Sequence, residues 1–110
     1  MDKKQTLEAL AALSQETRLD AFRQLVQVGA EGLPAGEIGE RLGVRQNTMS
    51  ANLAVLTHAG LIRSEREGRS IRYFAEMDGL RGLLEFLMEN CCGGAPELCR
   101  PVIAKLTCGC

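Results

Sequence analysis

Residues 34–61, PAGEIGERLGVRQNTMSANLAVLTHAGL, constrain the fold most strongly because two short helical patterns follow each other almost without a gap. The first pattern begins at Pro34 and ends at Gly43, residue types that favour a helix start and a helix end. The second repeats its apolar side chains at helical spacing, at Met49, Leu53 and Leu56. Only the turn Val44-Arg45-Gln46 separates them, which predicts two packed helices in a helix-turn-helix arrangement.

Two segments rich in β-forming residues come directly afterwards. Residues 61–66 and 70–76 flank the turn Glu67-Gly68-Arg69, with Gly68 at its tip. A helix-turn-helix followed by a basic two-stranded hairpin is a winged helix. The sequence therefore predicts a mainly α-helical fold with a small β-hairpin.

Three further helical patterns complete this domain. They cover residues 5–13, residues 15–29 after a favoured N-cap at Ser14, and residues 78–92. Their apolar stripes are Leu7, Leu10 and Leu13; Leu19, Phe22, Leu25 and Val26; and Leu80, Leu83, Leu84 and Leu87. Glycine and proline then interrupt the last pattern, and the remaining chain shows little periodicity.

These patterns predict two parts of the chain. Residues 1–92 form a winged helix-turn-helix domain for DNA binding and dimerisation, and residues 93–110 form a cysteine-containing tail. The leucines of the first and last helices present more apolar surface than one small domain covers, so we expect a homodimer.

The charge distribution points to double-stranded DNA as the partner. The whole chain carries a formal charge of −1, yet residues 45–74 hold five arginines against two glutamates, a local balance of +3. In a winged helix, side chains near the start of the second helix meet base edges in the major groove, and wing cations meet phosphates. The candidate DNA-binding residues are Arg45, Gln46, Asn47, Thr48, Ser50, Ala51, Asn52, Arg66, Arg69 and Arg72.

Other classes of protein fit the sequence poorly. There is no glycine-rich phosphate loop, a single histidine argues against a Ser-His-carboxylate set, and no pair of candidate catalytic carboxylates stands out, so we expect no enzyme. We found neither a membrane-spanning run nor a signal peptide, which predicts a cytoplasmic protein without membrane contact. A winged helix that binds only other proteins is the alternative that these features leave open.

The order of elements resembles the ArsR/SmtB family of bacterial metal-sensing repressors. The resemblance covers residues 5–92 and is most specific in LAALSQETRLDAFRQLV and LGVRQNTMSANLAVLTHAGLIRSEREGRSIRYF. It implies a homodimer that binds operator DNA and leaves it when an inducer binds. This chain departs from the family where Arg45 replaces the usual serine cap, so Asn47 is expected to cap a shorter helix, and where Ala51-Asn52 replaces a His-His pair.

The resemblance also bears on the five cysteines, all of which lie after residue 90. The third helix and the second helix hold no cysteine, and the lone His58 cannot supply a paired histidine site. The remaining kind of site in the family is that of the arsenic-responsive branch, which this chain resembles. It has an adjacent cysteine pair, Cys91 and Cys92, and a third expected ligand, Cys99. Trivalent arsenic is thus the expected inducer, and no organic cofactor is expected.

Chemistry supports a soft ligand but leaves alternatives open. Thiolates select soft acceptors, and three sulfur donors match the three As–S bonds of arsenite, with antimonite and methylarsenite as related inducers. There are four competing hypotheses: zinc in a four-cysteine site that also uses Cys108 or Cys110, another soft metal such as cadmium or lead, a thiol redox switch, and buried or inert cysteines without a role.

Overall fold

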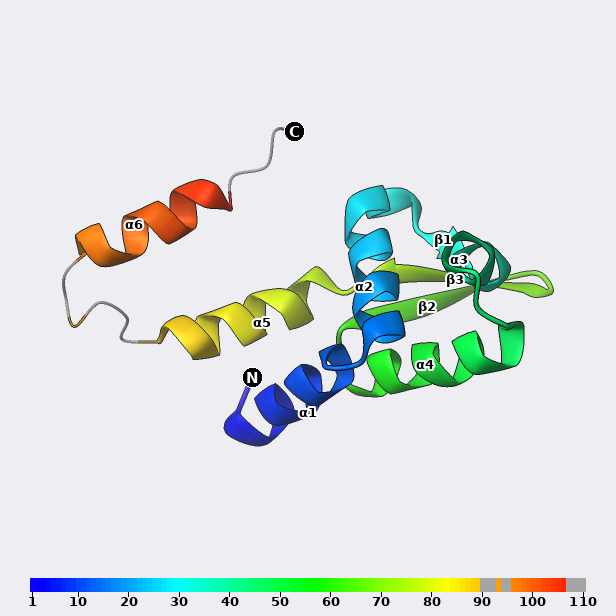
Figure 1. The fold of residues 1–110 in the computed structure, drawn as a ribbon, viewed down its shortest axis with the longest axis horizontal. Helices are drawn as coiled ribbons and strands as arrows, with labels where there is room; N and C mark the ends of the chain where they lie inside the picture. Colours follow the sequence, from blue (N-terminus) through cyan, green and yellow to red (C-terminus); the bar gives the residue numbers. More distant parts are fainter. Residues whose placement is uncertain (90–92, 94–95, 107–110) are drawn as a thin grey trace.

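The computed structural model describes residues 1–89, 93 and 96–106. Its elements, in chain order, are α1 (Lys3–Leu13), α2 (Glu16–Val28), the short 3-10 helix η1 (Gly29–Glu31), β1 (Leu33–Pro34), α3 (Ala35–Leu42), α4 (Gln46–His58), β2 (Ile62–Glu67), β3 (Ser70–Ala75), α5 (Met77–Met88) and α6 (Pro96–Lys105). Figure 1 shows α1 to α5 and the sheet as one body, with α6 beyond the end of α5. This arrangement confirms the predicted winged helix-turn-helix.

The core forms around the inner face of α4. Met49, Leu53 and Leu56 are fully buried there, as their helical spacing predicts. Side chains from α2, from α3 and from the start of the hairpin close around them, and the largest of these are Leu25, Ile38 and Leu61. The helix that is predicted to meet DNA is therefore also a central helix of the core.

Two predicted helix caps are wrong by one or two residues. Ser14 ends α1, and the N-cap of α2 is Gln15, whose side-chain oxygen accepts a hydrogen bond from the backbone N–H of Arg18 at 2.9 Å. Likewise α4 is not shortened, because it begins at Gln46 with Arg45 at the N-cap, and Asn47 lies inside the first turn. A glutamine side chain is long enough to replace serine at a helix start, which the usual preference for short polar caps does not anticipate.

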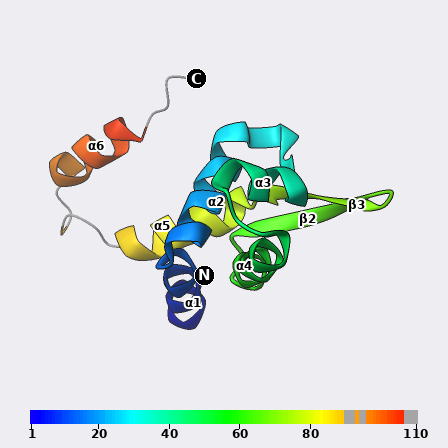
Figure 2. The ribbon, with the colours of Figure 1, turned by 45° about the vertical axis from the view of Figure 1, so that its right-hand side comes forward.

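The hairpin forms as predicted and gains a third strand. Strands β2 and β3 pair antiparallel from Ile62–Ala75 to Glu67–Ser70, with Gly68 at a φ of 60° in the turn. The short β1 adds to the other edge of β3, so the strand order is β1-β3-β2. Figure 2 shows the hairpin projecting from the helices as a wing. The two residues of β1 were not predicted because so short a strand carries no periodicity.

The start of α5 is held against the end of α4. The N–H of Glu76 donates to the carbonyl of Leu61 at 2.8 Å, and a Cβ added to Gly79 would overlap the carbonyl oxygen of Gly60. Gly60 itself has a φ of 78°, which favours glycine. Glycine at both positions therefore allows the backbone of α5 to contact the backbone that follows α4.

The apolar stripes of the outer helices are only partly covered. Leu83 of α5 is buried, whereas four leucines of α1 and α5 remain exposed (Leu7, Leu10, Leu84 and Leu87). On α2 the predicted stripe holds at Phe22 and Leu25 but not at Leu19 and Val26, which are exposed because the buried face turns toward Ala21.

Residues 96–105 show little periodicity in the sequence, yet they form α6 with Pro101 inside it. Most of its apolar side chains are exposed (Leu98, Val102 and Ile103), so the helix does not join the core of α1–α5. The preceding helix, α5, ends at Met88 rather than at residue 92. No helix within the described ranges has the length and apolar character needed to cross a membrane.

Replacing Gly79 with alanine should lower the free energy of unfolding by about 1–3 kcal/mol, because the new methyl group meets fixed backbone rather than a mobile side chain. Gly82, one turn later on the same helix, is the matched control. Its added Cβ would lie 3.3 Å from the flexible side chain of Met1. Urea denaturation should show Gly82→Ala within about 1 kcal/mol of wild type or more stable, since alanine favours helix. Equal stability of the two variants would contradict the close contact.

Candidate nucleic-acid interface

The start of α4 presents a continuous polar surface. Arg45 and the helix residues Gln46, Asn47, Thr48, Ser50 and Ala51 are all exposed, while Met49 between them points into the core. Asn47 Oδ1 accepts a hydrogen bond from the N–H of Thr48 at 2.9 Å. These side chains lie on the outward side of a helix whose inner side is fixed by burial, an arrangement suited to a DNA groove. Their contact with bases stays a prediction.

Asn52 does not belong to this surface. Its side chain is only 9% exposed, and its Oδ1 accepts a hydrogen bond from Nη1 of Arg18 at 3.2 Å. The predicted base contact of Asn52 does not fit this placement. No local pattern could have indicated the burial, because the partner lies 34 residues earlier on another helix.

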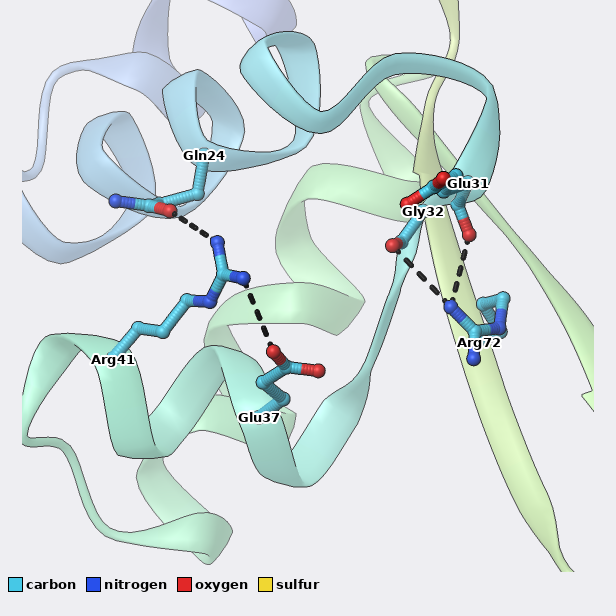
Figure 3. Close-up of polar contacts among 6 residues, drawn as sticks. All are labelled: Gln24, Glu31, Gly32, Glu37, Arg41 and Arg72. Atoms are coloured by element: carbon cyan, nitrogen blue, oxygen red, sulfur yellow. Dashed lines mark hydrogen bonds and ion pairs between the residues drawn. The ribbon is translucent and has the colours of Figure 1, made fainter.

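A polar bridge holds α3, the first helix of the pair, against α2. Arg41 donates from Nη2 to Glu37 on the same helix and from Nη1 to Oε1 of Gln24 on α2, both at 3.1 Å (Figure 3). Because α3 packs beside α4, this bridge also supports the position of α4. Arg41 was not predicted to have this role, because its spacing to Glu37 indicates only a helical ion pair.

Arg72 is folded back onto its own domain. Its Nη1 donates to the carbonyl oxygens of Glu31 and Gly32 at 2.9 and 3.3 Å, as Figure 3 shows, and its Nε donates to Glu67 at 2.7 Å. These bonds fasten β3 to the segment that leads into β1. The phosphate contact of Arg72 stays a prediction, and two of its guanidinium nitrogens, Nε and Nη1, already donate within the domain.

Arg63 is also engaged within the wing. Its guanidinium stacks over the ring of Phe74, 4.5 Å from the centroid, and its Nη1 lies 2.8 Å from Glu65. Both acidic groups of residues 45–74 are thus paired with an inner arginine, Glu65 with Arg63 and Glu67 with Arg72.

The local charge of +3 consequently resides on three side chains. Arg45, Arg66 and Arg69 are exposed, and their side chains make no hydrogen bond or ion pair with any residue that the structure describes. One lies at the start of α4 and two at or beside the tip of the wing. Cations placed at these two points can meet the backbone of one duplex from both sides of the reading helix.

The predicted cysteine site can be followed only in part. Cys91, Cys92, Cys108 and Cys110 lie outside the described residues. Cys99 is in α6, is 6% exposed and is disulfide-bonded. Among the described residues, no three Cys, His, Asp or Glu side chains gather in a way that could hold a metal ion. The assignment of the three thiols to an inducer therefore stays a prediction.

Replacing Arg66 or Arg69 with alanine should weaken binding to all duplexes alike and lower the slope of log K against log salt by about one each. Arg72→Ala should leave that slope nearly unchanged but lower the stability of the domain, because the carbonyls of Glu31 and Gly32 lose their donor. Fluorescence anisotropy across a salt series, with thermal unfolding in parallel, measures both effects. If Arg72→Ala lowers the slope and Arg66→Ala does not, the roles assigned to these two arginines are reversed.

Known proteins are similar to this chain in both sequence and fold. A helix-turn-helix domain model matches residues 13–65. An HTH-type transcriptional regulator of Bacillus subtilis, YceK, is 36% identical over 80 residues, which cover 69% of this chain and 79% of that protein. The domain model spans the two helices of the motif and much of the first strand of the wing.

Solved structures extend the match to the whole fold. An ArsR-like transcriptional regulator from Rhodococcus superposes with a TM-score of 0.70 at 26% identity, covering 97% of this chain and 96% of that one. A homodimeric winged helix-turn-helix DNA-binding domain from Mycobacterium bovis, described as a possible ArsR-family regulator, has a TM-score of 0.64 at 28% identity, with 79% and 81% covered. The chain thus belongs to the ArsR/SmtB family of winged helix-turn-helix transcriptional regulators.

Proposed function

We propose that this protein is a homodimeric repressor that binds operator DNA through α4 and the wing. The observation that carries the proposal is the division of charge in residues 45–74. Two arginines are paired within the wing, and the remaining three (Arg45, Arg66 and Arg69) are exposed beside the polar outward face of α4. Unpaired cations near a polar helix face match the phosphates that flank a DNA groove.

The proposed dimer rests on the uncovered leucines of the outer helices. Leu7 and Leu10 on α1 and Leu84 and Leu87 on α5 are exposed, and α1 packs beside α5 (Figure 1). Joined on two neighbouring helices, these side chains form a patch that a second copy would cover. Two α4 helices would then face half-sites about one helical turn apart on the duplex.

Replacing Leu84 with aspartate should weaken the dimer, because the charge would have to be buried at the interface. Ile71→Asp is the matched control, since both side chains are 39% exposed but Ile71 lies on the wing. Sedimentation at micromolar concentration should show the wild type and Ile71→Asp at twice the chain mass and Leu84→Asp shifted toward the monomer. A monomeric wild type would refute the dimer.

For the inducer we propose trivalent arsenic bound by Cys91, Cys92 and Cys99. Three thiols and As(OH)₃ give three As–S bonds and three water molecules, a reaction that requires reduced cysteines. A sulfur-only donor set favours such a soft acceptor over harder ions. Cys99 lies on a helix beyond the end of α5, so bonding it to the cysteine pair would draw the tail toward the dimer helices. A coupling of about 1–3 kcal/mol is enough to weaken DNA binding roughly 5–150-fold.

A thiol redox switch is the second candidate, and one observation favours it. Cys99 is already disulfide-bonded in the structure, so oxidation of two cysteine thiols is compatible with this fold. Formation of such a bond removes two electrons and two protons, which an added oxidant such as diamide accepts. The same tail would then change shape without any metal or metalloid.

Release from DNA distinguishes the two candidates. A labelled duplex selected by the wild-type protein is titrated with arsenite, antimonite, cadmium, lead, zinc or diamide, after reduction with a phosphine that does not compete as a thiol. We expect arsenite to release the wild type, whereas the triple variant Cys91→Ser, Cys92→Ser, Cys99→Ser keeps its affinity for DNA and no longer responds.

The double variant Cys108→Ser, Cys110→Ser is the control and should still respond to arsenite. If it fails to respond while Cys99→Ser still does, the site uses the extreme tail instead. Release by diamide, reversed by the phosphine, with no effect of arsenite, would favour the redox switch. Response to zinc alone would favour a four-cysteine metal site.

A further inference from the structure

Arg18, near the start of α2, contacts two other helices with one guanidinium group. Its Nε donates to the carbonyl oxygen of Ala12 in the last turn of α1 at 2.7 Å. Its Nη1 donates to Oδ1 of Asn52 in the middle of α4 at 3.2 Å. The side chain therefore connects the helix of the proposed dimer interface with the helix proposed to contact DNA.

Burial makes this connection sensitive to movement of α4. Asn52 and Thr6 are the two buried polar residues in the part of the chain that the structure describes. Within that same part, no buried side-chain nitrogen or oxygen lacks a hydrogen-bond partner. Loss of the charged donor would leave the amide oxygen of this largely buried side chain without its partner, which is unfavourable. Rotation of α4 about its axis, or a shift away from α2, would break the contact.

Burial of one face of α4 sets which side of the helix turns inward, and a directional contact restrains smaller rotations about the helix axis more sharply. Met49, Leu53 and Leu56 are held by apolar burial, which is not directional. The hydrogen bond to Asn52 is directional and lies at the same turn as Leu53. It therefore adds an angular restraint on α4 to the one that apolar burial provides.

We infer that Arg18 and Asn52 are positioning residues for DNA recognition, and that Asn52 does not read a base. The pair fixes the rotation of α4 so that Gln46, Asn47 and Ser50 face the duplex. This inference rests on the proposed function, since it concerns the same interface. It also places the carbonyl of Ala12, at the end of α1, in direct contact with the group that orients α4.

The test uses the full chain and a duplex enriched by the wild-type protein from a random pool. Asn52→Leu and Arg18→Met each remove one side of the contact with little change in size. Arg23→Met is the control, because Arg23 lies on the same helix, is exposed, and its side chain has no hydrogen bond or ion pair among the described residues. Circular dichroism and sedimentation first establish that each variant is a folded dimer.

We expect Asn52→Leu and Arg18→Met to weaken binding about tenfold, by the same factor for every single-base variant of the duplex, and without change in the salt slope. The double variant Arg18→Met, Asn52→Leu should bind DNA about as well as the weaker-binding single variant, because both substitutions remove the same contact. Arg23→Met should bind like the wild type. Asn52→Asp retains an acceptor for Arg18 and should fold and keep the wild-type base preference even if Asn52→Leu does not fold.

Three results would overturn the inference. A relaxed preference at one base pair in Asn52→Leu alone would mean that Asn52 reads that base. A salt slope lower by about one in Arg18→Met would mean that Arg18 contacts a phosphate. Wild-type binding by folded variants would mean that the contact serves stability only. If the wild type enriches no duplex, the proposed function itself fails and the inference falls with it.

Discussion

The burial of one face of α4 is the constraint on which the rest of this structure depends. Met49, Leu53 and Leu56 fill the centre of the core, so α4 cannot move without disturbing α2, α3 and the base of the wing. The polar face of α4 is exposed to solvent because the apolar face on its other side is fully buried. If a DNA-reading helix were flexibly attached, ordering it on binding would cost conformational entropy and weaken the affinity. Because α4 is already held in the core, its binding to DNA does not carry this entropic cost.

Arginines with similar positions in the sequence have quite different surroundings in the fold. Arg63 stacks on Phe74 and pairs with Glu65, and Arg72 donates to Glu67 and to two backbone carbonyls. These contacts hold the hairpin together and neutralise its acidic side chains. The exposed charge is thereby concentrated at Arg45, Arg66 and Arg69, where it does not disturb the packing of the strands.

The helices and the hairpin were predictable because helical spacing and the Gly68 turn are local signals. Features that depend on distant partners were not. Asn52 resembles an exposed polar residue until Arg18 is placed beside it, and Arg72 resembles a wing cation until β1 brings Glu31 and Gly32 close. The helix over residues 96–105 was missed because Pro101 and the surrounding residue types conceal it. Leucine spacing alone could not distinguish side chains that face the core from those that face a partner.

The short strand β1 has a consequence for how such a protein can be regulated. Leu33 and Pro34 pair with Tyr73 and Arg72 on the wing, and the next residue, Ala35, begins α3. The strand β1 thus joins β3 of the wing directly to the first helix of the motif. In the proposed dimer, each protomer would present α4 and its wing to the duplex as one connected unit. In the proposed dimer, an inducer bound at the tail would therefore act on the orientation of one such unit relative to the other.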